Sequence, residues 1–238
     1  MEGLTATSTL AEIVRTAPGS ERALEAHALD YCCGGRRRLV DACAETGVDP
    51  DAVLAEIDAL GPAAPVAWAT MRPGELVDHL ESTHHAYLHA ELPRLSALTA
   101  KVVGAHGERH PELAEVQRVF EAVRLDLEPH LAKEEQVLFP MIRELDRASA
   151  PPVFHCGSLR NPISVMLREH DAAGELLRRL RDVTGAFSTP GDGCASYRAL
   201  YDGYARLEAD THLHIHKEND VLFPAVVALE AAVATAGA

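Results

Sequence analysis

Hydrophobic residues recur at helical spacing along almost the whole chain, and runs that alternate in the manner of strands are nearly absent. Beyond residue 73 the pattern forms four long stretches, which cover residues 74–103, 112–146, 162–186 and 194–235. The breaks between them are short and rich in Gly, Pro and Ser. Four long helices with short links predict an all-α fold, an up-down-up-down four-helix bundle.

The first sixty residues carry shorter helical patterns. They predict four small helices: one capped by Ser8, one from Ser20 to Ala28, one over residues 36–45, and one that Asp49 caps and that runs to residue 60. Prolines then interrupt residues 63–73. The sequence thus predicts a small helical domain at 1–62, a linker at 63–73 whose Trp68 packs on the larger domain, and a bundle at 74–238.

One eleven-residue pattern occurs twice. Residues 130–140 read HLAKEEQVLFP, and residues 214–224 read HIHKENDVLFP. The similarity extends upstream, since His85 precedes His130 by 45 residues and His170 precedes His214 by 44. The bundle is therefore predicted to be an internal repeat of one helix pair, with the two halves related by a pseudo-two-fold axis.

The repeated positions have the chemistry of a metal site. Residues i and i+4 share one face of a helix, so His130 with Glu134, and His214 with Glu218, can reach one point. With His85 and His170 they place four imidazoles and two carboxylates in the bundle interior, which is unfavourable unless something binds them. Two metal ions bridged by the carboxylates satisfy all six groups. Imidazole and carboxylate donors without thiolate suit iron, manganese or zinc, and a bridged pair in a helical bundle favours iron.

Several neighbours compete for these roles. Spacing alone does not decide between His84 and His85, and His89, His212 and His216 form further i, i+4 pairs. Glu134 is preferred to Glu135, because Glu135 aligns with Asn219, a poor metal ligand. Pro129 predicts a kink directly before His130. The loop histidines His106 and His110 have no ligand pattern and are expected to be solvated.

Charge and cysteine content narrow the function classes. The net charge of −14 argues against nucleic acid or an anionic membrane as a partner. No long apolar run or signal-peptide pattern is present in the sequence, and the five cysteines include an adjacent pair, which is a poor disulfide framework. These features predict a cytoplasmic protein whose cysteines are reduced.

Three stretches make the chain resemble a known family. They are LDYCCGG at 29–35, LVDHLESTHHAYLHAELPRL at 76–95, and the set of HLAKEEQVLFPMI, PISVMLREHDAAGELL and HIHKENDVLFP. The bundle resembles the hemerythrin-like superfamily, and the whole chain resembles the repair-of-iron-centres (RIC) proteins. The resemblance implies two non-haem iron ions with carboxylate and oxo or hydroxo bridges. It places the ligands at His85, His130, Glu134, His170, His214 and Glu218, and so favours His85 over His84.

The resemblance also implies a function. The family is implicated in repairing iron–sulfur clusters damaged by nitrosative or oxidative stress, by donating iron, and nitric oxide reduction at the di-iron site is a second activity that the resemblance raises. Expected partners are damaged iron–sulfur proteins and small diatomic ligands, namely nitric oxide and dioxygen. A monomer or a dimer is compatible with this role.

The adjacent cysteines Cys32 and Cys33 are the second candidate site, with a catalytic role. They precede a predicted helix and three arginines, which favours thiolates that pass iron, trap nitrosyl species or form a redox pair. The alternative is that two small residues pack before a Gly-Gly turn.

Two other functions fit the same bundle. One is an oxygen or iron sensor, which needs no cysteine pair. The other is a bundle stabilised by zinc, which has no redox chemistry. Alanine at both cysteines separates repair from sensing, and removal of the six ligands separates both from the zinc bundle.

Overall fold

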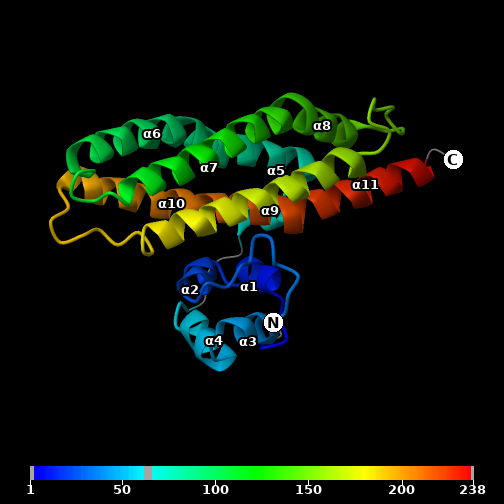
Figure 1. The fold of residues 1–238 in the computed structure, drawn as a ribbon. Coiled ribbons are helices and arrows are strands. Elements are labelled where there is room, and N and C mark those ends of the chain that lie inside the picture. Colours follow the sequence, from blue (N-terminus) through cyan, green and yellow to red (C-terminus); the bar gives the residue numbers. More distant parts are fainter. Residues whose placement is uncertain (1–2, 62–65, 237–238) are drawn as a thin grey trace.

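The computed structural model describes residues 3–61 and 66–236, and it confirms the all-α fold (Figure 1). Four long rods form the bundle. The first comprises α5 (Pro73–Leu80), η2 (Glu81–His85) and α6 (Ala86–His106), and the second α7 (Leu113–Lys133), η3 (Glu134–Leu138) and α8 (Phe139–Arg147). The third is α9 (Arg160–Val183), and the fourth comprises α10 (Ala195–Lys217), η4 (Glu218–Leu222) and α11 (Phe223–Ala236). The third rod ends three residues before the predicted 186, at a turn that begins with Thr184.

Two apolar clusters fill the bundle, one on each side of a polar layer. The larger contains Leu88, Phe120, Leu177 and Tyr204, and the smaller contains residues such as Leu138 and Phe223. The six predicted ligands lie between them along the rods and are all at most 3% exposed. The clusters therefore seal the polar layer from both ends, and the charged groups inside it lie in a medium of low polarity.

Three of the rods contain one wide π-turn, and each π-turn carries a predicted ligand. His85 is the last residue of η2, while Glu134 and Glu218 begin η3 and η4. A π-turn adds one residue to a helical turn and re-aims the side chains around it. In η3 and η4 it also explains the repeated Leu-Phe-Pro ending. The wider turn leaves room for the rings of Pro140 and Pro224, which would clash with a carbonyl inside a regular helix.

Prolines inside the rods do not interrupt them. Pro129 lies within α7, which continues to Lys133, and His130 still reaches the polar layer. At the start of α9, Leu159 is the capping residue, and the Asn161 amide donates to the carbonyl of Cys156 at 2.8 Å.

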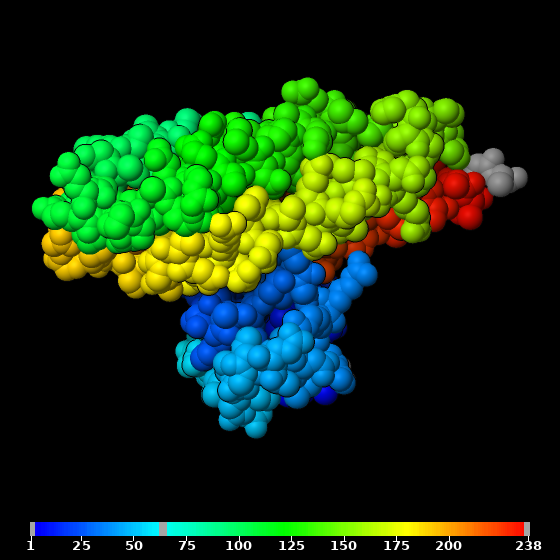
Figure 2. Space-filling model, in the orientation of Figure 1, coloured from blue at the N-terminus to red at the C-terminus, as the bar shows by residue number. Residues whose placement is uncertain are grey.

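The small domain contains α1 (Leu10–Thr16), α2 (Ser20–Ala26), α3 (Leu39–Thr46) and α4 (Pro50–Asp58). Thr9, rather than Ser8, caps α1 through a reciprocal pair with Glu12. The helix predicted from residue 36 begins only at Leu39. Asp49 caps α4 as predicted. Figure 2 shows this domain packed against the face of the bundle that α9 and the C-terminal rod form. Its core is continuous with the larger bundle cluster.

The predicted linker begins among residues 62–65, which lie outside the described residues. Its described part forms the short turn η1 (Ala67–Thr70) and leads into α5. Trp68 in this turn is buried in the smaller bundle cluster, as expected, and its ring lies 5.4 Å from the Lys217 ammonium nitrogen.

Candidate metal centre

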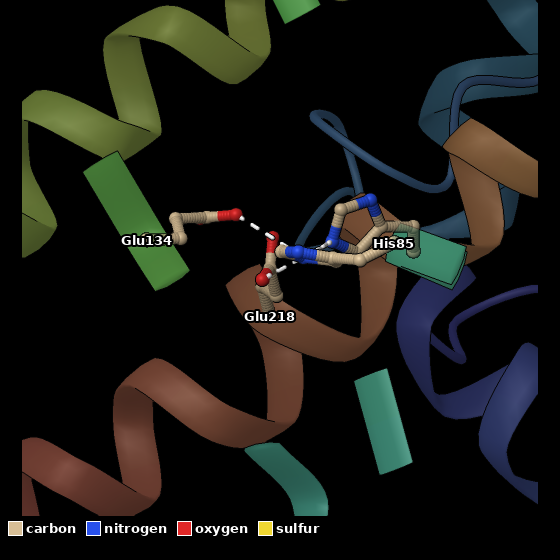
Figure 3. Close-up of side chains that lie close together, drawn as sticks. His85, Glu134 and Glu218 are labelled. Atoms are coloured by element: carbon tan, nitrogen blue, oxygen red, sulfur yellow. Dashed lines mark hydrogen bonds and ion pairs between the residues drawn. The ribbon is translucent and has the colours of Figure 1, made fainter. Parts of the chain in front are cut away.

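All four rods deliver a histidine to the polar layer, and the second and fourth also deliver a glutamate. The structure brings the six predicted ligands together as two groups of four donors. His85 and His214 belong to the first group, and His130 and His170 belong to the second. Glu134 and Glu218 belong to both. Figure 3 shows these two carboxylates approaching from different rods, with the His85 ring beside them.

Each carboxylate has one oxygen toward each histidine pair. Glu134 Oε2 lies 3.5 Å from His85 Nε2, and its Oε1 lies 3.4 Å from His130 Nε2. Glu218 Oε1 lies 3.2 Å from His214 Nε2, and its Oε2 lies 3.2 Å from His170 Nε2. Within each pair the Nε2 atoms are 3.2 Å and 3.1 Å apart. This is the arrangement that two bridging carboxylates between two cations require.

The carboxylate oxygens of the site lack hydrogen-bond partners among the described residues, although all four are buried. Burial and the facing charge of Glu218 raise the pKa of Glu134 well above its ordinary value. Burial lowers the pKa of His130 and His214 to about 4, so both rings stay neutral, as metal ligands must. The residues present therefore fit a pair of cations.

Hydrogen bonds behind His85, His130 and His170 aim their Nε2 lone pairs inward, while His214 Nδ1 has no hydrogen-bond partner among the described residues. His85 Nδ1 lies 2.8 Å from Glu135, and His130 Nδ1 lies 3.0 Å from Glu169. Because a carboxylate only accepts, each Nδ1 carries the hydrogen and each Nε2 is left bare. His170 Nδ1 is held by Asn219 at 2.8 Å. Bare Nε2 atoms that face each other need a cation between them.

Sequence reasoning set aside three of these supporting residues or missed them. Glu135 and Asn219 align in the repeat, but they were weighed only as ligands, and Glu169 was not considered. The signal was the alignment itself, since both aligned residues follow a glutamate predicted to bridge and each contacts the histidine of a neighbouring rod. Residues matched in a repeat can support ligands without being ligands.

The competing histidines lie outside both donor groups. His84 Nδ1 contacts Asp210 at 2.9 Å, and its Nε2 lies 2.7 Å from the Lys217 ammonium. His89 contacts Glu135. His216 pairs with Asp220 beneath the small domain, and His212 lines the cavity beside that domain. Of the neighbours His84 and His85, His85 alone belongs to a donor group of the described residues, and its role as a ligand stays a prediction.

The cysteine pair lies directly beside the metal centre, where two domains meet. Cys33 Sγ is 3.5 Å from the backbone oxygen of His170, and Asn219 Nδ2 donates to the carbonyl of Cys32 at 3.0 Å. Both cysteines line a cavity of about 570 Å³ between the small domain and α9. With Asp30 they form a third group of donors that can hold a metal ion.

The expected thiolate at Cys32 is wrong. The hydrogen bond to Cys33, burial and the nearby Asp30 carboxylate hold the pKa of the Cys32 thiol well above its ordinary value. Both favourable influences are also reduced. The next helix begins at Leu39, and the side chains of Arg37 and Arg38 pair with Glu45 and Asp41.

The thiol with the lowered pKa is instead Cys194, the exposed capping residue of α10. His106 Nε2 lies 3.2 Å from its sulfur, and His106 is buried rather than solvated as expected. Arg109 donates to His106 Nδ1 at 3.3 Å, so the ring hydrogen sits on Nε2 and points at the sulfur. This hydrogen bond and backbone N–H groups of the α10 first turn lower the pKa of Cys194 to about 7.

We expect Cys194 to react first of the five cysteines with iodoacetamide near neutral pH. The thiolate is the nucleophile, so the rate should rise with pH around a midpoint of about 7 and level off above it. Peptide mass spectrometry over a pH series measures this. His106→Gln should move the midpoint upward, and a wild-type midpoint at the ordinary value of about 8.5 contradicts the expectation.

The bundle and the small domain each match a known protein family. Residues 76–226 match the hemerythrin HHE cation binding domain, and residues 6–61 match ScdA_N, a domain of unknown function. The iron-sulfur cluster repair protein YtfE of Enterobacter sp. (strain 638) is 34% identical over 93% of this chain and 97% of its own length. The proteins of that name from Citrobacter koseri and Escherichia coli O1:K1 / APEC are 32% identical over the same shares.

No helix among the described residues is long and apolar enough to cross a membrane. An N-terminal ScdA_N domain, a hemerythrin bundle with a cation-binding layer, and similarity across nearly the full length all point the same way. The chain belongs to the hemerythrin-domain family of the iron–sulfur cluster repair proteins.

Proposed function

We propose that this protein holds two iron ions between its two histidine pairs and donates iron to damaged iron–sulfur clusters. The observation that carries the proposal is the pair of shared carboxylates, whose four oxygens are buried without hydrogen-bond partners among the described residues. Imidazole and carboxylate donors without thiolate suit iron. Iron held there supplies redox cycling between its ferrous and ferric forms. The names of the relatives support repair over the sensor alternative.

Cargo iron has a short path out of the centre. The His130–His170 group lies nearest the small domain, because Cys33 Sγ contacts the backbone of His170. Beyond it, the Asp30, Cys32 and Cys33 donors border the cavity between the domains. Softer sulfur donors beside a set of nitrogen and oxygen donors give ferrous iron a second place to bind on its way to a thiolate acceptor.

The first test measures iron content per chain in protein purified without oxygen, followed by transfer of ferrous iron to an apo-protein that binds an iron–sulfur cluster. We expect two irons per chain. Cys33→Ser should keep both irons but slow the transfer by about tenfold or more, because the relay next to the centre is lost. Cys156→Ser is the matched control, since Cys156 is also half-buried but contacts Met141. Zinc in place of iron, or transfer by Cys33→Ser at the wild-type rate, would overturn the proposal or its route.

A further inference from the structure

The side chain of Asn219 connects the Cys-Cys-Gly-Gly loop (residues 32–35) to His170, a predicted metal ligand. Its Oδ1 lies 2.8 Å from His170 Nδ1, and its Nδ2 donates to the backbone carbonyl of Cys32 at 3.0 Å. The residue is buried, with 9% of its surface exposed. One amide group therefore contacts the small domain with one end and the bundle centre with the other.

The Cys32 carbonyl decides which way this amide points. An amide has a donor end and an acceptor end of almost the same shape, so either end can face a histidine. A backbone carbonyl only accepts, so the NH₂ group must face Cys32 and the oxygen must face His170. His170 Nδ1 then has to donate, which leaves Nε2 bare toward the centre.

Glu135, the residue matched to Asn219 in the other half of the bundle, orients its histidine without a contact to the small domain. Glu135 occupies the position equivalent to Asn219, and it holds His85 Nδ1 at 2.8 Å. A carboxylate accepts with either oxygen, so His85 keeps Nε2 bare whatever surrounds Glu135. His130 is secured in the same way by Glu169. Of these three histidines, only His170 depends on a contact with the small domain.

We infer that Asn219 is a positioning residue through which docking of the Cys-Cys-Gly-Gly loop selects the metal-binding tautomer of His170. When the loop leaves, the amide is free to turn its NH₂ group toward Nδ1, and the ring hydrogen moves to Nε2, where it blocks the metal. Docking thus governs how firmly iron is held at the His130–His170 position, while the His85–His214 position is unaffected. This inference rests on the proposed function, since it concerns iron at that centre.

The loop is shaped to dock closely. Asp30 accepts hydrogen bonds from the backbone N–H groups of Cys32, Cys33 and Gly34 and fixes the turn. Gly35 packs against Asp220, and a Cβ there would overlap Asp220 Oδ2 and lie 2.7 Å from the Tyr31 carbonyl oxygen. From the bundle side, a Cβ at Gly174 would lie 3.4 Å from Cys33 Sγ. Small residues on both surfaces allow the contact.

The test compares iron binding in four proteins: wild type, Gly35→Ala, Asn219→Asp and the double variant. Ferrous iron is titrated in, and its release to a chelator is followed. Gly35→Ala should weaken one of the two irons by about 10–100-fold, the effect of losing an orienting hydrogen bond, and leave the other unchanged. Asn219→Asp should hold both irons, because a carboxylate accepts from His170 without the loop. The double variant should therefore regain the second iron.

Matched controls keep the result decisive. Gly191→Ala changes a loop glycine with nothing near its Cβ and should behave as wild type. Gly174→Leu pushes the loop away from the bundle side and replaces Gly35→Ala if that variant does not fold. A displaced loop that leaves both irons at wild-type affinity, or a second iron that Asn219→Asp does not restore, overturns the inference. The wild-type stoichiometry decides the proposed function separately, since a wild type without two irons contradicts that function first.

Discussion

Glu134→Ala should remove both metal ions from the centre, whereas His85→Ala should remove one. The reason is that each oxygen of Glu134 faces a different histidine pair, at 3.5 Å from His85 Nε2 and 3.4 Å from His130 Nε2. Loss of an orienting residue behind a ligand already weakens metal binding by about 10–100-fold, and loss of a shared charged ligand should exceed that at both positions. Metal analysis of anaerobically purified protein gives the count.

Glu144→Ala provides the control for this change, because Glu144 is an exposed glutamate on the same rod and should keep two ions. One full equivalent of metal in Glu134→Ala contradicts the shared role of the carboxylate. Such a result restricts Glu134 to one histidine pair and leaves Glu218 as the only bridge.

Glu134→Gln should stabilise the metal-free protein although it abolishes metal binding. Without a cation, Glu134 has to keep its proton beside the buried Glu218 carboxylate, which becomes more costly as pH rises, whereas the amide N–H of glutamine can donate to Glu218 at any pH. Satisfying such a buried group is worth about 1–3 kcal/mol. Metal-loaded wild type should be the more stable protein, because each tightly bound ion adds about 2.7 kcal/mol at a hundredfold excess over its Kd.

The pH dependence of this effect has a definite sign. In the folded protein the pKa of Glu134 is raised above its ordinary value of 4.5, so the folded state keeps its proton where the unfolded state loses it. The contribution of Glu134 to the stability of the metal-free wild type is therefore lost as pH rises above that value. The advantage of Glu134→Gln should grow from pH 5 to pH 8 in urea denaturation with a chelator present. A metal-free Glu134→Gln that is less stable than the metal-free wild type at pH 8 contradicts the expectation.

The long-range layout of the bundle could be predicted because it depends on periodicity. Apolar spacing gave the four rods, and the repeated His-x-x-x-Glu gave the donor set, since i, i+4 pairs share a helix face. The structure brings those six residues together, and their role as ligands stays a prediction. The wide turns at His85, Glu134 and Glu218 could not be predicted, because one inserted residue changes the geometry of the helix without changing the spacing of the motif.

Contacts between distant segments were harder to foresee. Cys33, burial and Asp30 raise the pKa of the Cys32 thiol, and they outweigh the nearby arginines, two of which pair with acids of their own. Cys194 shows the opposite, because its partner His106 lies 88 residues away. Electrostatics at a thiol depends on neighbours in space, which only the folded chain identifies.

The wide turns have a consequence for protein engineers who wish to transplant this centre. A straight designed helix can carry the His-x-x-x-Glu motif, but three of the four rods here have a residue inserted at a π-turn where they reach the centre. A graft therefore has to carry the insertion and, in two rods, the Leu-Phe-Pro segment that follows it. Idealised scaffolds exclude such irregularities by rule, so the backbone must be drawn around the ligands before any sequence is chosen.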